Sequence, residues 1–265
     1  MSDVSVEKNG ATLVITLDNP EVKNAINLGM QNELTSALRE ASRDLEVRAV
    51  VLTGGGDVFC SGTDTRQISN KKGVFEGTSA PRTRHGYTHG IQQMSKAFFD
   101  CEVPIIAAVN GPAIGLGFDL TIQCDIRIAS ENASFSEAFI TFGLIPGDGG
   151  FWYLPRIVGY SRAVEMTITG KRIDAATAES WGLVSQVVPK GDSLTEALAL
   201  AEQIAKRPPQ TVRLSKKLIR DADQLSFHEA LDLGAMAQAV LTGSDDQQES
   251  AAAMRERRDG NYQSR

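Results

Sequence analysis

The spacing of apolar residues predicts that strands and a helix alternate in the N-terminal third of the chain. Val4–Val6 and Thr12–Leu17 are short apolar runs on either side of a turn at Asn9–Gly10, which is typical of two strands. Apolar residues recur at helical spacing from Leu28 to Ser42, and Ala49 to Leu52 is a continuous apolar run that ends at a glycine triplet. The order strand, strand, helix, strand indicates a mixed α/β core.

The middle of the chain continues this alternation after a polar interruption. Residues 66–86 are polar with little periodicity, so we expect a loop there, followed by a helix at about 87–99. Val103 to Val109 and Asp125 to Ala129 are predicted strands, and a short helix is expected between them after Gly115-Leu116-Gly117.

The pattern changes after Pro189, where nearly every segment has helical spacing. Pro208–Pro209 and Gly243 interrupt this region. We therefore expect an α/β core over residues 1–190 and a helical C-terminal region over residues 191–265. The predicted C-terminal helices lie at about 193–206, 210–222, 226–241 and 244–257.

The charge of the chain argues against two classes of partner. The 27 Lys and Arg residues against 33 Asp and Glu residues give a net charge of −6 with no basic block, so we expect neither nucleic-acid nor membrane binding. The longest apolar run, Val103 to Val109, is far shorter than the roughly 20 residues of a membrane-spanning helix. The first ten residues lack the basic and apolar parts of a signal peptide, and Cys60, Cys101 and Cys124 form no C-x-x-C pair. These features favour a cytoplasmic protein.

Most familiar cofactor and catalytic motifs are missing from the sequence. Gly115-Leu116-Gly117 lacks the third glycine of a dinucleotide-binding fingerprint, and Gly170–Lys171 lacks the rest of a P-loop. The sequence contains neither a G-x-S-x-G nucleophile turn nor an H-E-x-x-H zinc motif. The three histidines form no metal-ligand pattern, so we expect no metal site.

Two segments of the chain share a layout that suits oxyanion binding. In each, a buried strand leads into a turn of small residues and then to an acid, first at Ser61-Gly62-Thr63-Asp64 and again at Gly115-Leu116-Gly117-Phe118-Asp119. The first N–H groups of a helix have no internal partner, so two such turns facing each other can direct two donors at one oxygen. Ordinary strand-to-helix turns have the same spacing, and the spacing alone leaves both interpretations open.

At this level of detail the chain resembles the crotonase superfamily, also called the enoyl-CoA hydratase/isomerase superfamily, over nearly its whole length. The matching motifs occur in the family's order and at its spacing. They are Lys23-Asn24-Ala25-Ile26, Ser61-Gly62-Thr63-Asp64, Ala108-Val109-Asn110-Gly111 with Gly115-Leu116-Gly117-Phe118-Asp119, Cys124-Asp125-Ile126-Arg127-Ile128-Ala129, Phe142-Gly143-Leu144-Ile145-Pro146-Gly147-Asp148-Gly149-Gly150 and Trp181-Gly182-Leu183-Val184.

This resemblance implies a crotonase-like spiral of ββα units with a C-terminal helical region used in trimer packing, as a homotrimer or a dimer of trimers. It implies a coenzyme A thioester as substrate and no permanently bound cofactor. The backbone N–H groups of Thr63 and Leu116 would hold the thioester oxygen. The coenzyme and acyl parts would contact the loops that carry Lys23, Ala25, Ser61, Gly62, Asp64, Gly115 and Phe139, and Arg257 matches a basic position near a neighbouring subunit's ligand.

The sequence departs from the family's hydratase pattern at both catalytic glutamates. Asp119 stands at the first position with a shorter side chain, and Phe139, which cannot transfer a proton, stands at the second. Glu137 lies two residues before Phe139 and need not point the same way. We expect Asp148, whose loop borders the acyl pocket in relatives, to act in catalysis with Asp119, although an Asp before a helix is also a good N-cap.

The function that this pattern predicts best is hydration of a 2-enoyl-CoA. Three alternatives remain open at this point: an isomerase that moves a double bond between the 3- and 2-positions, a C–C bond hydrolase of the same family, and a non-catalytic or RNA-binding member. An isomerase needs one carboxylate, because a single base can remove and return the proton.

Overall fold

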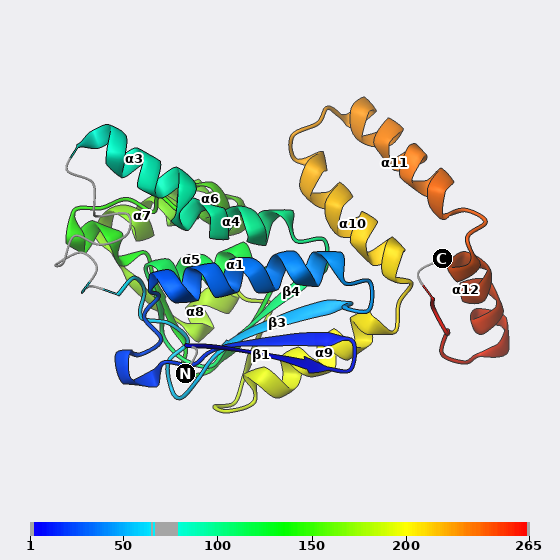
Figure 1. Cartoon of the computed structure of the whole chain (residues 1–265), viewed down its shortest axis with the longest axis horizontal. Helices are drawn as coiled ribbons and strands as arrows, with labels where there is room; N and C mark the ends of the chain where they lie inside the picture. The colour runs from blue at the N-terminus through cyan, green and yellow to red at the C-terminus, as the bar shows by residue number, and fades with distance from the viewer. Residues whose placement is uncertain (1–2, 65, 67–78, 264–265) are drawn as a thin grey trace.

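The computed structural model describes residues 3–64, 66 and 79–263, and its centre is a twisted six-stranded sheet (Figure 1). An antiparallel hairpin, β1–β2, begins the sheet, and every later neighbour pairs in parallel. The mixed α/β class predicted from the pattern is confirmed. The strands, in spatial order, are β1 (Val4–Asn9), β2 (Thr12–Leu17), β3 (Ala49–Gly54), β4 (Ile105–Val109), β6 (Ile126–Ser130) and β9 (Gln186–Val188).

The central strands are apolar throughout because helices cover both faces of the sheet. Val50 and Leu52 of β3 pack into the core beneath α1 (Leu28–Arg43) and α4 (Ile91–Asp100), whereas Ala49 and Val51 face α9 (Ser193–Ala205). Side chains of a strand alternate between faces, so a strand buried on both sides has a continuous apolar sequence. The helix α9, which follows residue 190, is thus part of the sheet's own packing.

A second, three-stranded sheet lies beside the first and carries the turns that form the candidate site. Its strands are β5 (Ala113–Ile114), β7 (Ser134–Ser136) and β8 (Arg172–Asp174). Ile114 pairs in parallel with Ser136, and the N–H of Gly115 donates to the carbonyl of Ser136 at 2.8 Å. The remaining short helices are η1 (Pro20–Val22), α5 (Leu116–Gln123), η3 (Ala138–Phe142), α6 (Gly150–Val158), α7 (Tyr160–Thr169) and α8 (Ala175–Ser180).

The structure corrects the predicted loop at 66–86 and helix at 87–99. Residues 67–78 lie outside the described part of the chain, but α3 spans Ala80–His89 and α4 follows at Ile91. Pro81, a loop signal in the sequence, stands in the first turn of α3, where a proline costs no helical hydrogen bond. Gly90, with φ −108° and ψ −110°, separates the two helices.

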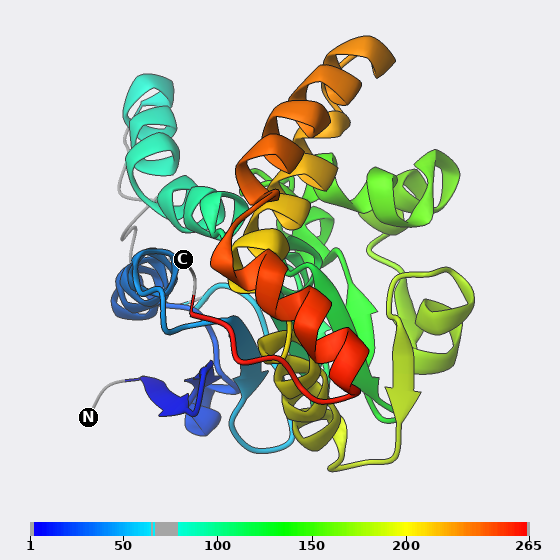
Figure 2. The same cartoon turned by 90° about the vertical axis from the view of Figure 1, so that its right-hand side faces the viewer.

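The C-terminal helices have nearly the predicted limits, and those that follow α9 extend from the body of the molecule (Figures 1 and 2). Arg213 anchors the first of them by donating to the carbonyls of Ser42 at 2.8 Å and Asp44 at 3.0 Å. No helix in the described residues has the length and apolarity needed to cross a membrane. The extended helices are α10 (Pro209–Ala222), α11 (Phe227–Leu241) and α12 (Asp245–Glu256).

Candidate active site

Two turns run side by side at the carboxyl ends of β3 and β4. Cys60 and Ala113 form a parallel bridge, and the N–H of Ile114 donates to the carbonyl of Cys60 at 3.0 Å. A Cβ on Gly117 would lie 2.3 Å from that same carbonyl oxygen, so only glycine allows α5 to begin this close to the neighbouring turn. The two glycine-containing motifs singled out in the sequence are therefore neighbours in space.

The N–H groups of Thr63 and Leu116 are free donors at this junction. Leu116 is the first residue of α5, and its N–H has no acceptor among the described residues; the same holds for Thr63. Gly115 turns the chain into the helix with φ 53° and ψ −123°, a conformation that side chains disfavour. Both donors line one pocket, as expected of two groups that bind one oxygen.

Asn24 holds the first of these turns in place. Its buried side-chain amide donates to the carbonyls of Gly55, Val58 and Phe59 at 2.9, 2.8 and 3.2 Å, and its oxygen accepts from the N–H of Asn19 at 3.0 Å. Its backbone has φ 55°, which asparagine tolerates better than most residues. One side chain thus fixes the loop that leads to Thr63.

We expect Asn24→Ala to lower the free energy of unfolding by about 2–4 kcal/mol, because it leaves buried carbonyls unpaired and strains the backbone. Urea denaturation measures this difference. Asn24→Gly is the matched control, since it relieves the strain and still lacks the amide. A loss below about 0.5 kcal/mol in the alanine variant would mean that the hydrogen bonds add nothing measurable.

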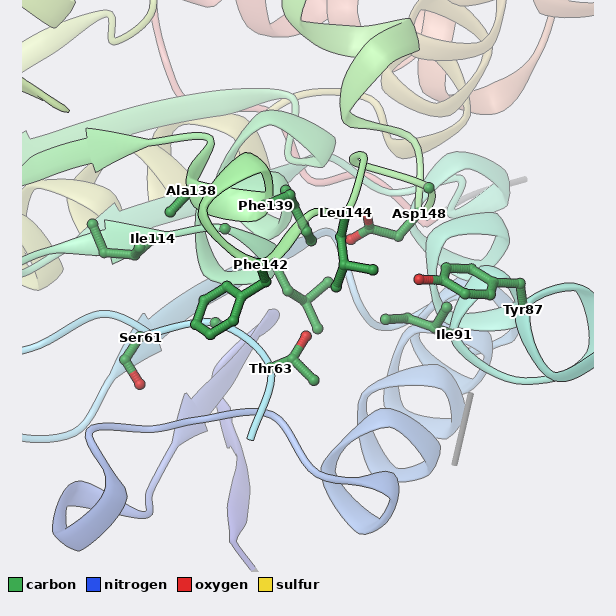
Figure 3. Close-up of a pocket in the computed structure, with 14 residues that line it drawn as sticks. Ser61, Thr63, Tyr87, Ile91, Ile114, Ala138, Phe139, Phe142, Leu144 and Asp148 are labelled. Carbon is green, nitrogen blue, oxygen red and sulfur yellow. The ribbon is translucent and has the colours of Figure 1, made fainter. Parts of the chain in front are cut away.

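The pocket beside the two donors is mainly apolar (Figure 3). Asp148 and Tyr87 lie on one side with their polar ends turned inward, and Ser61 and Ile114 lie on the opposite side (Figure 3). An apolar lining with few polar groups is typical of a small-molecule site. The complete lining is Ser61, Gly62, Thr63, Tyr87, Ile91, Ile114, Gly115, Leu116, Ala138, Phe139, Phe142, Leu144, Gly147 and Asp148.

The pocket gathers most, but not all, of the residues that the sequence predicted for the site. Among the predicted binding residues, Lys23, Ala25 and Asp64 are absent from its lining. Lys23 is exposed, and its backbone carbonyl accepts from the N–H of Ser61 at 3.0 Å, so it borders the same loop. Ala25 is buried, and Asp64 pairs with Arg66 at 2.7 Å, which lowers the pKa of the Asp64 carboxyl.

Three carboxyl groups converge behind the pocket, and we call Asp119, Glu137 and Asp148 the buried carboxyl cluster. Their exposed fractions are 0%, 0% and 3%. A Cβ on Gly150 would lie 2.4 Å from Asp119 Oδ1 and 2.6 Å from Glu137 Oε1, so these two carboxyls meet at the first residue of α6. Asp148 alone of the cluster lines the pocket.

The surroundings of the buried carboxyl cluster raise the pKa values of its three members. Both oxygens of Asp119, both oxygens of Glu137 and Oδ2 of Asp148 receive no hydrogen bond from other groups among the described residues. Burial, and then the charges of Asp148 and Glu137, raise the pKa of Asp119 well above its ordinary range. Burial also raises the pKa of Glu137 to about 8, and it raises the pKa of Asp148. The hydrogen bond from a protonated Asp119 partly offsets the shift in each.

Asp148 does not serve as a helix cap, the other role that the sequence allowed. The N-cap of α6 is Gly149, and no side chain caps this helix. The loop of Asp148 is instead fixed by glutamines: Gln92 Nε2 donates to the carbonyl of Gly147 at 2.8 Å, and Gln123 Nε2 to that of Asp148 at 3.4 Å. The carboxyl of Asp148 is therefore free for the pocket.

Sequence reasoning missed two residues of this site. Glu137 is not among the predicted site residues, yet it joins the cluster, while Phe139 lines the pocket. Tyr87 stands on α3, at the position where the predicted helix was expected to begin. Burial, and then the charge of Asp148, raise the pKa of Tyr87. One signal for Glu137 was present in the sequence: it is an acidic residue that lies two positions from an expected catalytic position.

No group of acids, histidines or cysteines in the described residues is arranged to hold a metal.

The chain matches proteins of one family along its whole length. Residues 7–265 match the family model described as enoyl-CoA hydratase/isomerase. A "probable enoyl-CoA hydratase" of Rhodobacter capsulatus is 38% identical, with 95% of this chain and 94% of that protein covered. The 2,3-dehydroadipyl-CoA hydratase of Escherichia coli is 31% identical over all of both chains. The crystal structure of an enoyl-CoA hydratase from Bacillus anthracis superposes with a TM-score of 0.91 at 33% identity, covering 99% of this chain and 100% of that one.

Proposed function

Because the chain belongs to the enoyl-CoA hydratase/isomerase family, we propose that it hydrates a 2-enoyl-CoA thioester to the 3-hydroxyacyl-CoA. The observation that carries this proposal is the placement of the Asp148 carboxyl in the same apolar pocket as the free N–H groups of Thr63 and Leu116. An acid–base group and two oxyanion donors are the parts that addition of water to an unsaturated thioester needs.

The chemistry begins at the thioester oxygen, which accepts hydrogen bonds from the N–H groups of Thr63 and Leu116. These bonds stabilise the enolate that forms when the oxygen of water adds to C3 and the C2=C3 electron pair moves toward the thioester. The ionised Asp148 takes a proton from the water as its C3–O bond forms. The protonated Asp148 then returns that proton to C2, which restores the thioester carbonyl and leaves Asp148 as it began.

The coenzyme A part of the substrate would lie outside the apolar pocket, along the loops of Lys23 and Ser61. The exposed ammonium of Lys23 is placed to attract phosphate oxygens, and the hydrogen bond from Ser61 holds the two loops together. Phe139, Phe142 and Leu144 favour an apolar acyl group at the other end. This reaction needs no cofactor beyond the coenzyme A that the substrate carries.

One observation favours a second candidate, isomerisation of a 3-enoyl-CoA to the 2-enoyl-CoA. Asp148 is the single carboxyl of the cluster that lines the pocket, whereas Asp119 is fully buried behind it. A single base suffices for isomerisation, because it removes a proton from C2 and returns it to C4 while the oxyanion donors hold the dienolate.

Absorbance of the conjugated thioester distinguishes the two reactions. We expect absorbance to fall when the purified protein is mixed with short- and medium-chain 2-enoyl-CoA thioesters in water. A gain of absorbance with 3-enoyl-CoA, and no loss with 2-enoyl-CoA, would assign the isomerase instead. If neither substrate changes, although a thioester raises the melting temperature, the hydratase and isomerase assignments are both wrong.

We also propose that the protein is a cytoplasmic homotrimer or dimer of trimers. Phe227 and Leu231 on one side of α11 and Met236 and Val240 on the opposite side are 54–74% exposed, and large apolar side chains gathered on an extended helix are normally covered by another subunit. Three buried, unpaired cysteines fit a reducing compartment. We expect Leu231→Glu with Val240→Glu to give monomers in sedimentation velocity, while Glu165→Gln on the distant helix α7 keeps the wild-type assembly. A wild-type monomer would contradict the proposal.

A further inference from the structure

We propose that Tyr87 is a second catalytic residue of the hydration: its hydroxyl binds the water molecule that Asp148 deprotonates and directs that water toward C3 of the enoyl group. This inference rests on the proposed function, which needs a water held in one orientation beside the substrate. Asp148 alone cannot fix that orientation, because a single hydrogen bond leaves the water free to rotate about it.

Tyr87 lies in the pocket beside Asp148. It stands near the end of α3, four residues before Ile91 of α4, and all three residues line the same pocket. The hydroxyl of Tyr87 and the carboxyl of Asp148 point into the pocket from one side, and Ser61 and Ile114 lie on the opposite side (Figure 3). Water that enters the pocket beside Asp148 therefore meets the Tyr87 hydroxyl as well.

Two contacts hold Tyr87 in place against the loop of Asp148. The edge of the Tyr87 ring lies against Gly147: a Cβ on this glycine would be 3.0 Å from Cε1 and 3.5 Å from Cδ1 of the ring. Gln92, on the next helix, donates to the carbonyl of the same glycine at 2.8 Å. Because Gly147 directly precedes Asp148 in the chain, these contacts fix the position of the hydroxyl relative to the carboxyl.

The protein itself leaves the hydroxyl of Tyr87 available. This hydroxyl makes no hydrogen bond to any of the described residues, although the ring is half-buried and packs on the hydrophobic core. A buried tyrosine normally has a partner for its hydroxyl. Burial, and then the charge of Asp148, raise the pKa of Tyr87, so the group keeps its proton at neutral pH. A neutral hydroxyl can both accept and donate a hydrogen bond, as a bound water requires.

The other side chains of the pocket are less suited to this role. Phe139 stands where the family motif has its second glutamate, and it offers no hydrogen-bonding group. The hydroxyl of Ser61 donates to the carbonyl of Val22 at 3.3 Å. The hydroxyl of Thr63 belongs to a residue whose N–H binds the thioester oxygen in the proposed reaction, so it lies at C1 of the substrate rather than at C3. Tyr87 is therefore the best-placed acceptor for the water.

The proposed step leaves Tyr87 unchanged. One hydrogen of the water points to the carboxylate of Asp148 and the other to Oη of Tyr87, so a lone pair of the water oxygen faces C3. As the C3–O bond forms, the C2=C3 electron pair moves toward the thioester, and the first hydrogen passes to Asp148 as a proton. The second hydrogen stays on the oxygen and becomes that of the 3-hydroxyl group. Asp148 then delivers its proton to C2.

The test is the hydration of 2-enoyl-CoA by Tyr87→Phe, which removes the hydroxyl and keeps the ring that packs against Gly147. We expect kcat to fall about 10–100-fold and KM to change less than about threefold, because the water and not the thioester loses a partner. Tyr160→Phe is the matched control, since it makes the same change at a tyrosine that is 78% exposed. It should keep the wild-type kcat and KM.

Exchange of the C2 hydrogen of a saturated acyl-CoA in D₂O separates loss of the water from damage to the pocket. This exchange uses Asp148 and the N–H groups of Thr63 and Leu116 to form the enolate, and it adds no water to C3. We expect Tyr87→Phe to exchange this hydrogen within about threefold of the wild-type rate, as measured by mass spectrometry. Equal losses of exchange and hydration would overturn the inference, because they would show that the substitution disturbs Asp148 or the oxyanion donors.

Failure of the proposed function and failure of this inference give different results. Wild-type protein that does not hydrate 2-enoyl-CoA overturns the proposed function, and with it any role for a bound water. Wild-type protein that hydrates 2-enoyl-CoA, with kcat of Tyr87→Phe within about threefold of it, overturns the inference about Tyr87 alone. A raised KM with unchanged kcat in Tyr87→Phe also overturns it, because the hydroxyl would then bind the acyl group and not the water.

Discussion

Asp148→Asn is expected to lower kcat by about 10²–10⁴-fold, because the amide can neither accept a proton from water nor return one to C2. Asp148 is the one member of the buried carboxyl cluster that reaches the pocket, so no other carboxylate of the cluster can substitute for it. Binding of a saturated acyl-CoA should persist, because the two backbone donors and the apolar lining remain. Stopped-flow absorbance with a 2-enoyl-CoA measures kcat, and calorimetry with the saturated thioester measures binding.

We expect Asp148→Asn to be at least as stable as the wild type. Burial raises the pKa of Asp148, so its ionised form is disfavoured in the folded chain, and a neutral isostere removes that cost. Asp192→Asn is a suitable control, since Asp192 is exposed and caps no helix by its side chain. Turnover in Asp148→Asn within about threefold of the wild type would refute a catalytic role for Asp148 and direct attention to a water-mediated path from Asp119.

Leu116→Pro is expected to lower kcat by about 10²–10³-fold, which is the usual cost of removing one oxyanion donor. Proline lacks the backbone N–H, and Leu116 occupies the first position of α5, where helices accept proline without losing an internal hydrogen bond. The substitution therefore removes one donor while leaving the helix able to form. The rate with 2-enoyl-CoA, measured at saturating substrate, reports the loss.

The buried side chain of Leu116 requires its own control. Leu116→Ala also removes most of that side chain, which is 1% exposed, but it keeps the N–H. We expect the alanine variant to lose stability by about 2–5 kcal/mol and to keep most of its activity per folded molecule. If the alanine and proline variants lose kcat equally, packing around Leu116 rather than its N–H supports the reaction.

Local pattern predicted the secondary structure well wherever a segment has one clear period. The strand at Thr12–Leu17 has the predicted limits, and the predicted helix 210–222 differs from α10 by one residue at its start. The error at α3 arose where polar composition hides helical periodicity. Ala80–His89 buries no residue, so no apolar stripe marks it, and Pro81 has the same sequence signal at a helix start as in a loop.

The proposed oxyanion donors, the N–H groups of Thr63 and Leu116, could be inferred from the sequence because they belong to the backbone. Their position depends on glycines and on the turn from strand to helix, and both are local features that a sequence motif records. The side chains at these positions need not be special. A motif is therefore sufficient to place such donors, and the structure brings both to one pocket.

The sequence by itself determined the alternation of strands and helices, the two small-residue turns and the presence of acidic residues near these turns. Only the tertiary structure decided which acids meet. The parallel pairing of Ile114 with Ser136 brings Glu137 to the start of α5, and the close approach of Gly150 brings α6 and Asp148 to the same point. Proton affinity depends on burial and on neighbouring charges rather than on position in the chain. The raised pKa values of Asp119, Glu137 and Asp148 therefore follow from contacts between segments that are 18 and 11 residues apart, which no local pattern specifies.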